Sequence, residues 1–245
     1  MAYGHAGRHI ALAAAGRTAT DLAMRQVSRS PTVRTGSSAR KETPMKIAIL
    51  GTGGVAHALG AGWKKSGHDV IFGARDASAT DPDFEITGLQ DALAAGDVIV
   101  NAITGAVALQ AITALDTSAM AGKTLLDATH ARTGSGDLLY PNSSLAEHLQ
   151  AALPAVNVVK SLNTAAIEVL ADPSLVEPAT VFVSGDEEVA KAEVKGLLHD
   201  LGWTDEGIID LGGIRTARGP EHYAVLFFEI VAVLKSRLVN IHVTR

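Results

Sequence analysis

A glycine-rich turn is the part of this sequence whose residue types and spacing most clearly permit chemistry. Residues 51–56 read GTGGVA and directly follow the apolar run KIAIL at 46–50. In a strand–turn–helix of this kind, Gly51 makes the tight turn, Gly53 lets the backbone approach a ligand, and Ala56 lets the helix pack on the strand. The free N–H groups at the start of the helix bind anions. We therefore expect a dinucleotide, with its pyrophosphate at this turn.

The end of the second expected strand bears on which dinucleotide is bound. Ala74, Arg75 and Asp76 follow that strand, about 20 residues after the glycine turn. An acidic residue here accepts a hydrogen bond from the ribose 2′-OH of NAD. Arg75 instead offers a planar guanidinium that pairs with a 2′-phosphate. The sequence favours NADP, with NAD as the alternative if Asp76 takes the position of the acid.

The glycine turn opens a regular alternation of strands and helices. Expected strands cover residues 46–50, 69–73, 97–103, 123–127, 156–162, 180–185 and 208–211. Expected helices cover residues 55–65, 90–95, 106–115, 144–153, 164–170, 187–201 (capped by Asp186) and 220–237. Most strands are continuous apolar runs, which is typical of strands covered on both faces. The pattern predicts an α/β fold, a Rossmann-type doubly wound, mostly parallel sheet with a small helical C-terminal extension. Between the second and third strands we expect a long loop or a reduced helix.

Further candidates follow the third strand, because ligands of open α/β sheets bind outside the carboxyl ends of the strands. Ala102, Ile103 and Thr104 come at the end of that strand. Their small or short side chains leave room for the ribose and phosphate on the nicotinamide side of the cofactor. We expect them to line the bound nucleotide.

Polar residues follow the fourth and fifth strands at the same edge. His130 and Asn163 are the candidate catalytic residues, and His130 could hydrogen-bond the carbonyl of an acceptor. A histidine without a chemical role, and helix capping by Asn163 and Thr164, are the alternatives. Lys160 is expected at the cofactor edge or in solvent rather than as a catalytic base. Direct hydride transfer needs orientation and exclusion of water more than it needs acid–base groups.

Composition divides the chain and excludes several classes of protein. The 245 residues carry a net charge of −5, so no overall positive field attracts nucleic acid or an anionic membrane. Residues 1–44 are expected to be a disordered or spurious leader, with a transit peptide as the alternative. Residues 45–185 are the expected NADP-binding domain. Residues 186–245 are expected to form a C-terminal α/β extension that builds the acceptor pocket and a dimer surface.

The expected location is the cytoplasm. There is no cysteine, which excludes disulfides and thiolate metal sites. His5 and His9 have no third ligand near them in the sequence, so we predict no metal site. The most apolar run, residues 223–234, is shorter than the roughly 20 residues that span a bilayer.

Residues 45–245 resemble a known family. The motifs GTGGVA at 51–56, GARD at 73–76 and the C-terminal succession VFVSGD…LLHDLGW…IIDLGGIRTARGPE…VNIHVTR are similar to those of the NADPH-dependent reductases of the deazaflavin coenzyme F-420. The nucleotide domain of membrane ferric reductases is similar too. The resemblance implies hydride transfer between NADPH and the deazaflavin in a homodimer.

The resemblance also implies roles for individual residues. The implied cofactor-binding residues are Thr52, Gly53, Gly54 and Val55 at the phosphates, Ala74 and Arg75 at the adenosine phosphate, and Thr104, Ala108 and Ala131 along the cofactor. Gly51, Ala102 and Ile103 join this expected set through the turn and the strand end described above. The implied acceptor residues are Val239 and Asn240, and Thr164 is a further candidate from its place after the fifth strand. Ala74 and Thr104 depart from the family pattern, which often has serine and proline there. Two alternatives stay open, a reductase of another small acceptor (a flavin, a ferric chelate, a carbonyl or an imine) and a non-catalytic NADP-binding redox sensor.

Overall fold

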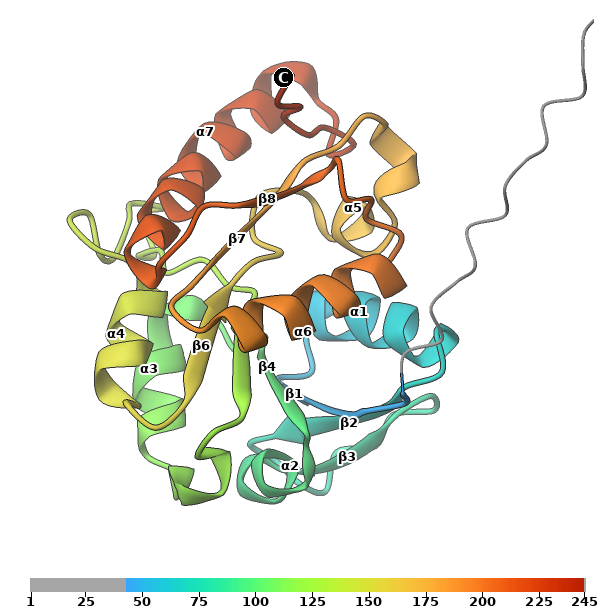
Figure 1. Ribbon diagram of the computed structural model, residues 1–245, viewed down its shortest axis with the longest axis vertical. Coiled ribbons are helices and arrows are strands. Elements are labelled where there is room, and N and C mark those ends of the chain that lie inside the picture. Colours follow the sequence, from blue (N-terminus) through green and yellow to red (C-terminus); the bar gives the residue numbers. More distant parts are fainter. Residues whose placement is uncertain (1–42, 245) are drawn as a thin grey trace, which may run out of the picture. The chain divides into compact units, whose positions relative to one another are not determined.

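Strands and helices alternate along residues 43–244, the part of the chain that this computed structural model describes (Figure 1). The strands are β1 (Lys46–Leu50), β2 (Asp69–Ala74), β3 (Glu85–Gly88), β4 (Val98–Asn101), β5 (Thr124–Asp127), β6 (Asn157–Lys160), β7 (Val181–Gly185) and β8 (Ile208–Asp210). The helices are α1 (Gly54–Lys65), α2 (Leu89–Ala95), α3 (Gly105–Thr113), α4 (Leu145–Ala152), α5 (Ile167–Ala171), α6 (Glu188–Asp200) and α7 (Arg218–Leu234). Short 3-10 turns are η1 (Thr117–Met120), η2 (Pro173–Val176) and η3 (Ile214–Ala217). The expected leader, with His5 and His9, lies outside the described residues except for residues 43 and 44.

The strands form one sheet in the order β3-β2-β1-β4-β5-β6-β7-β8. Neighbouring strands are parallel, except that β7 runs antiparallel to β6. Strand order reverses between β1 and β4, so the carboxyl ends of these two strands flank the crevice where such sheets bind ligands. The predicted α/β fold with a Rossmann-type, mostly parallel sheet is confirmed.

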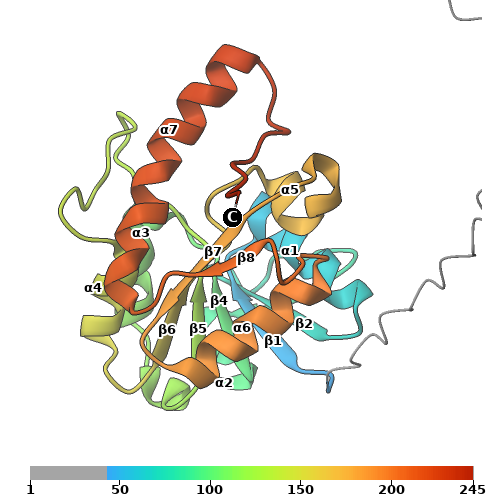
Figure 2. The same cartoon turned by 45° about the horizontal axis from the view of Figure 1, so that its top comes forward.

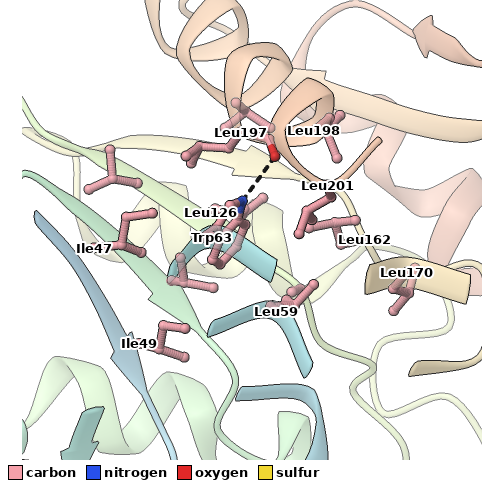
Figure 3. Close-up of a cluster of buried hydrophobic side chains, with 14 of the residues drawn as sticks. Ile47, Ile49, Leu59, Trp63, Leu126, Leu162, Leu170, Leu197, Leu198 and Leu201 are labelled. Carbon is pink, nitrogen blue, oxygen red and sulfur yellow. Dashed lines mark hydrogen bonds between the residues drawn. The ribbon is translucent and has the colours of Figure 1, made fainter. Parts of the chain in front are cut away.

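Helices cover both faces of the sheet, and each face has its own core cluster. On one face α1 packs against α5 and α6, and on the other lie α2, α3 and α4. Trp63 on α1 is fully buried, and its Nε1 donates a hydrogen bond to the carbonyl oxygen of Leu197 on α6 over 2.9 Å (Figure 3). This contact fixes α1, and with it the glycine turn at its start, against the C-terminal part of the chain.

The structure corrects the expected elements between the second and third strands. Instead of a loop or reduced helix alone, an additional edge strand, β3, pairs in parallel with β2 from Ile71–Glu85 to Ala74–Gly88. Its sequence, EITG, is short and only half-buried, so it lacks the apolar run that marks the other strands.

Helix boundaries also differ from the expected ones. The helix expected to start at residue 164 starts at Ile167, and α7 covers Arg218–Leu234 rather than 220–237. Asp186 was expected to cap α6, but Glu187 is the N-cap residue, and Asp186 Oδ1 instead accepts a hydrogen bond from the Ile214 backbone N–H over 2.9 Å. No helix within residues 43–244 has the length and apolarity that crossing a membrane requires.

The reversed strand β7 extends the sheet beyond the end of β6. Gly185 pairs with Val159 and Ser184 pairs with Lys160, the last residue of β6. The earlier residues of β7 therefore lie past the carboxyl end of β6, where β8 pairs with them. The sheet thus continues across the expected domain boundary at residue 185, and the division into a nucleotide domain and an extension stays a prediction.

Candidate functional site

The glycine turn between β1 and α1 has backbone geometry that requires glycine at its first position. Gly51 has a φ of +117°, and a Cβ at this residue would lie 2.8 Å from the carbonyl oxygen of Ala102. The Gly51 N–H donates to the carbonyl oxygen of Gly73 over 2.8 Å, which ties the turn to β2. Gly53, by contrast, would have open space around a Cβ. That space is the cradle through which a ligand can approach the backbone.

The start of α1 fits an anionic group. Its N-cap residue, Gly53, provides no side-chain cap, and the first turn contains no acidic residue. Thr52, Gly53 and Gly54 are exposed and Val55 is half-buried. Helix N-termini with free N–H groups carry a partial positive charge that binds phosphate. The residues predicted to hold the pyrophosphate therefore suit it on this structural ground.

Arg75 lies exposed just after β2, whereas Ala74 is buried in that strand. The neighbouring Asp76 is engaged in its own turn, because its Oδ1 accepts hydrogen bonds from Ser78 Oγ over 2.6 Å and from the Ser78 backbone N–H over 2.9 Å. These bonds hold the pKa of Asp76 below its ordinary value. Within residues 43–244 the Asp76 carboxylate is thus bound in its own turn, whereas the Arg75 guanidinium has no hydrogen-bond or ion-pair partner.

A buried charged cluster joins the ends of β4, β5 and β6. Lys160 Nζ lies 2.9 Å from Asp127 Oδ2 and 3.1 Å from Glu221 Oε1. Asp127 Oδ1 accepts further hydrogen bonds from Asn101 Nδ2 over 2.9 Å and from Thr129 Oγ1 over 2.8 Å. The expectation of Lys160 in solvent is wrong, since its side chain is fully buried. Its alternative place at the cofactor edge stays a prediction. Burial alone lowers the pKa of Lys160, but the two carboxylates outweigh it and the pKa is raised.

Glu221 links this cluster to two helices. It lies on α7, and its Oε2 accepts a hydrogen bond from the backbone N–H of Leu145, the first residue of α4, over 3.1 Å. A carboxylate is stabilised at a helix N-terminus, which helps to offset the second negative charge beside one lysine. Because Glu221 is distant in sequence from Lys160 and Asp127, no local motif predicted the cluster.

His130 follows β5 and is packed against α7. Its ring centroid lies 6.1 Å from that of Phe228, and its Nδ1 is buried with no hydrogen-bond partner in the described part of the chain, although the residue as a whole is half-buried. Burial, followed by the charges of Lys160 and Arg132, lowers the pKa of His130 to about 3. His130 is therefore neutral near pH 7. It can form one hydrogen bond through Nδ1, but it has no imidazolium proton to deliver.

Asn163 and Thr164 leave β6 in an unusual backbone conformation. Leu162, just before them, has a φ of 53°, in the left-handed region that non-glycine residues rarely adopt. Both residues are 2% exposed, and Asn163 Nδ2 and Thr164 Oγ1 have no hydrogen-bond partner among the residues that the structure describes. The capping alternative is wrong, because the N-cap residue of α5 is Ala166. Backbone strain and unpaired buried polar atoms are both costly, and they cluster at functional sites.

The residues predicted along the cofactor after β4 differ in accessibility. Ala102 and Ile103 are half-buried and Thr104 is exposed at the N-cap of α3. Ala108 is fully buried in the core, and Ala131 is 2% exposed. Both methyl groups are enclosed by protein, and the placement of Ala108 and Ala131 along the cofactor stays a prediction.

The chain end lies at the start of β7. Asn240 Oδ1 accepts a hydrogen bond from the Thr180 backbone N–H over 2.8 Å, and the backbone N–H of Val243 donates to Thr180 Oγ1 over 3.2 Å. A cavity of about 410 Å³ beside this segment is lined by Pro173, Glu177, Pro178, Ala179, Gly202, Trp203, Thr204, Glu206, Gly207 and His242. These residues include none of those predicted for the cofactor or the acceptor, so the role of Val239 and Asn240 stays a prediction.

The parallel sheet with its glycine turn and open crevice defines a Rossmann-type α/β protein. A family model described as NADP oxidoreductase, coenzyme F-420-dependent, matches residues 46–131. A crystal structure of a provisionally named F-420-dependent NADP-reductase from Arthrobacter sp. FB24 is 34% identical, has a TM-score of 0.77, and covers 82% of this chain and 100% of that one. The chain belongs to this family of NADP-dependent oxidoreductases.

Two further matches extend the comparison. Metalloreductase STEAP3 of Rattus norvegicus is 29% identical over 185 residues, which make up 74% of this chain but only 36% of the metalloreductase. The chain thus spans about a third of the length of that curated relative. An imine reductase from Myxococcus stipitatus in complex with NADP⁺ is 15% identical with a TM-score of 0.58, and the match covers 78% of this chain and 63% of that one. This last likeness shows a shared fold.

Proposed function

We propose that the protein binds NADP(H) and transfers hydride between NADPH and a flat deazaflavin or flavin-like acceptor. The observation that carries this proposal is the set of buried, unpaired polar atoms, His130 Nδ1, Asn163 Nδ2 and Thr164 Oγ1, beyond the ends of β5 and β6. Unpaired buried groups are costly, and a ligand with hydrogen-bonding edges offsets that cost. Membership of the family supports NADP as the cofactor.

The cofactor would be held by the turn and by Arg75. The N–H groups of Gly53 and Gly54 at the start of α1 would bind the diphosphate, and Arg75 would pair with the adenosine phosphate. When bound, NADPH supplies the hydride. The chain's own contribution is orientation and exclusion of water, which needs no ionised side chain at the reacting atoms.

The acceptor would lie beside Asn163 and Thr164. Asn163 has an amide donor and Thr164 has a hydroxyl, so both can bind the carbonyl and ring-nitrogen edge of a flavin-like molecule. Neutral His130 would position the acceptor through one hydrogen bond. The C-terminal residues Val239 and Asn240 complete the proposal as residues of the acceptor pocket.

The proposal is tested by anaerobic mixing of the protein with NADPH and oxidised deazaflavin, followed by absorbance. Rapid bleaching of the deazaflavin is the expected result. Bleaching only with a free flavin, a ferric chelate or a carbonyl or imine substrate would assign a different acceptor. NADPH binding without turnover on any acceptor would contradict enzymatic activity and favour a redox sensor.

A homodimer is part of the proposal. Exposed apolar side chains gather on α7 and the chain end, namely Val225, Leu226, Phe228, Val233, Leu234, Leu238, Ile241 and Val243. In Figures 1 and 2 the far half of α7 projects beyond the sheet. Apolar patches of this kind mark interaction sites. A cytoplasmic location is expected with this function.

Sedimentation velocity tests the dimer. Leu226→Lys should convert a dimer into a monomer, because it places a charge within the apolar patch. Val189 on α6 is 83% exposed and offers a matched control, so Val189→Lys should leave the sedimentation coefficient unchanged. A monomeric unmodified protein would contradict this part of the proposal.

A further inference from the structure

His57 connects the two regions that the proposed function assigns to the cofactor. It lies on α1, four residues after Gly53, and its Nδ1 is 3.1 Å from the Gly53 carbonyl oxygen. Its Nε2 is 2.7 Å from Asp81 Oδ2. Asp81 belongs to the loop of residues 75–84, which begins with Arg75. The imidazole therefore bridges the glycine turn and the loop that carries the arginine.

Both contacts of this ring are to acceptors. A backbone carbonyl and a carboxylate can only accept hydrogen bonds, and neutral imidazole has one N–H. The two contacts can be satisfied together only when both ring nitrogens carry protons, as in the imidazolium ion. The hydrogen bonds to Asp81 and Gly53 raise the pKa of His57 above its ordinary value, in agreement with this geometry.

Asp81 in turn organises the loop. Its other oxygen, Oδ1, accepts hydrogen bonds from the backbone N–H groups of Asp83 over 2.9 Å and Phe84 over 3.1 Å. The rings of Phe72 and Phe84 stack with their centroids 4.3 Å apart, and the His57 ring lies edge-on to both. The imidazole is thus held between the sheet and the loop, with Asp81 fixing the loop's backbone.

The charges around this loop make the proton of His57 important for an anionic ligand. The loop contains Arg75 together with three aspartates, Asp76, Asp81 and Asp83. On α1, Lys64 donates to the backbone carbonyl oxygen of Asp83 and lies over the Phe84 ring. Without a proton on His57, the carboxylate of Asp81 would be uncompensated and would repel a nearby phosphate.

We propose that His57, through its contact with Asp81, is a positioning residue that sets the preference for NADP over NAD. It holds the Arg75 loop against the glycine turn in its imidazolium form. The inference rests on the proposed binding of NADP(H), and it adds a residue that does not itself touch the 2′-phosphate. The preference should therefore depend on pH, because loss of the proton releases one of the two contacts.

The test measures dissociation constants of NADPH and NADH by calorimetry for the unmodified protein and for His57→Gln and Asp81→Asn. We expect the ratio of the NADH constant to the NADPH constant to fall about fivefold or more in His57→Gln, as for loss of one nearby positive charge. In Asp81→Asn the ratio should also fall, because the contact that holds the Arg75 loop to His57 is lost. His199→Gln is the matched control, since His199 Nε2 lies 3.1 Å from Asp205 Oδ1 in another histidine–aspartate pair, at the end of α6. This control should leave the ratio unchanged.

A pH series separates positioning from a merely structural role. In the unmodified protein, the ratio should fall as pH rises from 6.5 to 9.5 and His57 loses its proton. The 2′-phosphate itself titrates near pH 6. The ratio of the unmodified protein is therefore compared, at each pH, with the ratio of His57→Gln, which should not fall in the same way. His57→Lys keeps a cation that stays charged over most of this range, and it should retain the preference with a weaker pH dependence.

The outcomes distinguish the inference from the function on which it rests. An unchanged ratio in folded His57→Gln and Asp81→Asn, or an equal fall in His199→Gln, would overturn the role of His57 alone. Absence of uptake of both nucleotides by the unmodified protein would overturn the proposed function instead. Thermal midpoints of the variants verify that each of them is folded.

Discussion

Lys160 on β6 and Glu221 on α7 form an ion pair of 3.1 Å that is closed to solvent. Together with Asp127, this pair attaches the last helix to the strand ends beside the candidate acceptor residues. Ionic groups removed from water are costly when one partner is lost, because the remaining charge has no compensation. The position of α7 beside His130 therefore depends on the intact cluster.

Lys160→Met should strongly destabilise the protein. It leaves the buried carboxylates of Asp127 and Glu221 without their cation, and we expect a loss of about 3–5 kcal/mol in the free energy of unfolding. Glu221→Gln should cost less, because the amide oxygen can still accept the hydrogen bond from the Leu145 backbone N–H and Lys160 keeps its ion pair with Asp127. Urea denaturation measures both values. Equal stability of Lys160→Met and the unmodified protein would contradict the structural role of the pair.

Arg75→Ala should weaken NADPH binding about 10- to 100-fold, the loss expected for a charge-assisted hydrogen bond to phosphate. NADH, which lacks the 2′-phosphate, should be affected much less. Lys65→Ala removes another exposed cation, at the far end of α1, and is the control. The increase in nicotinamide fluorescence on binding provides the measurement. An unchanged preference for NADPH in Arg75→Ala would remove Arg75 from the cofactor site.

Gly51→Ala and Gly53→Ala should separate folding from binding. At Gly51 the added methyl group would lie 2.8 Å from the carbonyl oxygen of Ala102, and the φ of +117° is strained for alanine. We therefore expect a loss of about 1–3 kcal/mol in the free energy of unfolding. At Gly53 the φ is −86° and the space is open, so stability should be unchanged. Gly53→Ala should nevertheless weaken nucleotide binding, because the methyl group occupies the cradle. Thermal unfolding and calorimetry give the two readouts, and normal nucleotide affinity in Gly53→Ala would place the pyrophosphate elsewhere.

His130 should make the free energy of unfolding depend on pH in the acidic range. Its pKa in the folded protein is about 3, against an ordinary value of 6.5, because burial disfavours the charged ring. The unfolded chain therefore binds a proton between these values while the folded protein does not, and stability falls as pH decreases from about 6.5 toward 3. His130→Gln should show a shallower fall over this window in urea denaturation. Identical slopes for the two proteins would contradict the burial of the imidazole.

The sequence was sufficient for the nucleotide half of the fold, because its signals are local. The apolar runs of β1 and β2 and the glycines between them lie within 30 residues and obey short-range backbone rules. β3 was missed because a half-buried edge strand has no apolar run.

The charged cluster could not be predicted, because Lys160 and Glu221 meet only through the packing of α7 on the sheet. His57 was missed for a related reason. Its partner Asp81 lies in a loop whose conformation no propensity specifies. By contrast, the sequence did point to His130 and Asn163, since both follow strands at the ligand-binding edge, but it could not show that their polar atoms are buried and unpaired.

The reversal between β6 and β7 has an evolutionary consequence. In an ordinary crossover between parallel strands, the chain would leave the carboxyl ends of the strands and return along a face of the sheet, so that the next strand starts at the amino-terminal end. Here residues 161–180 connect antiparallel strands and need not make that passage. Changes in the length of this segment can therefore remodel the surroundings of Asn163 without altering the pairing of β1 with β2, provided that α5 keeps its packing on α1. Related proteins can in this way vary the region around Asn163 while they keep the pairing of β1 with β2 that positions the glycine turn.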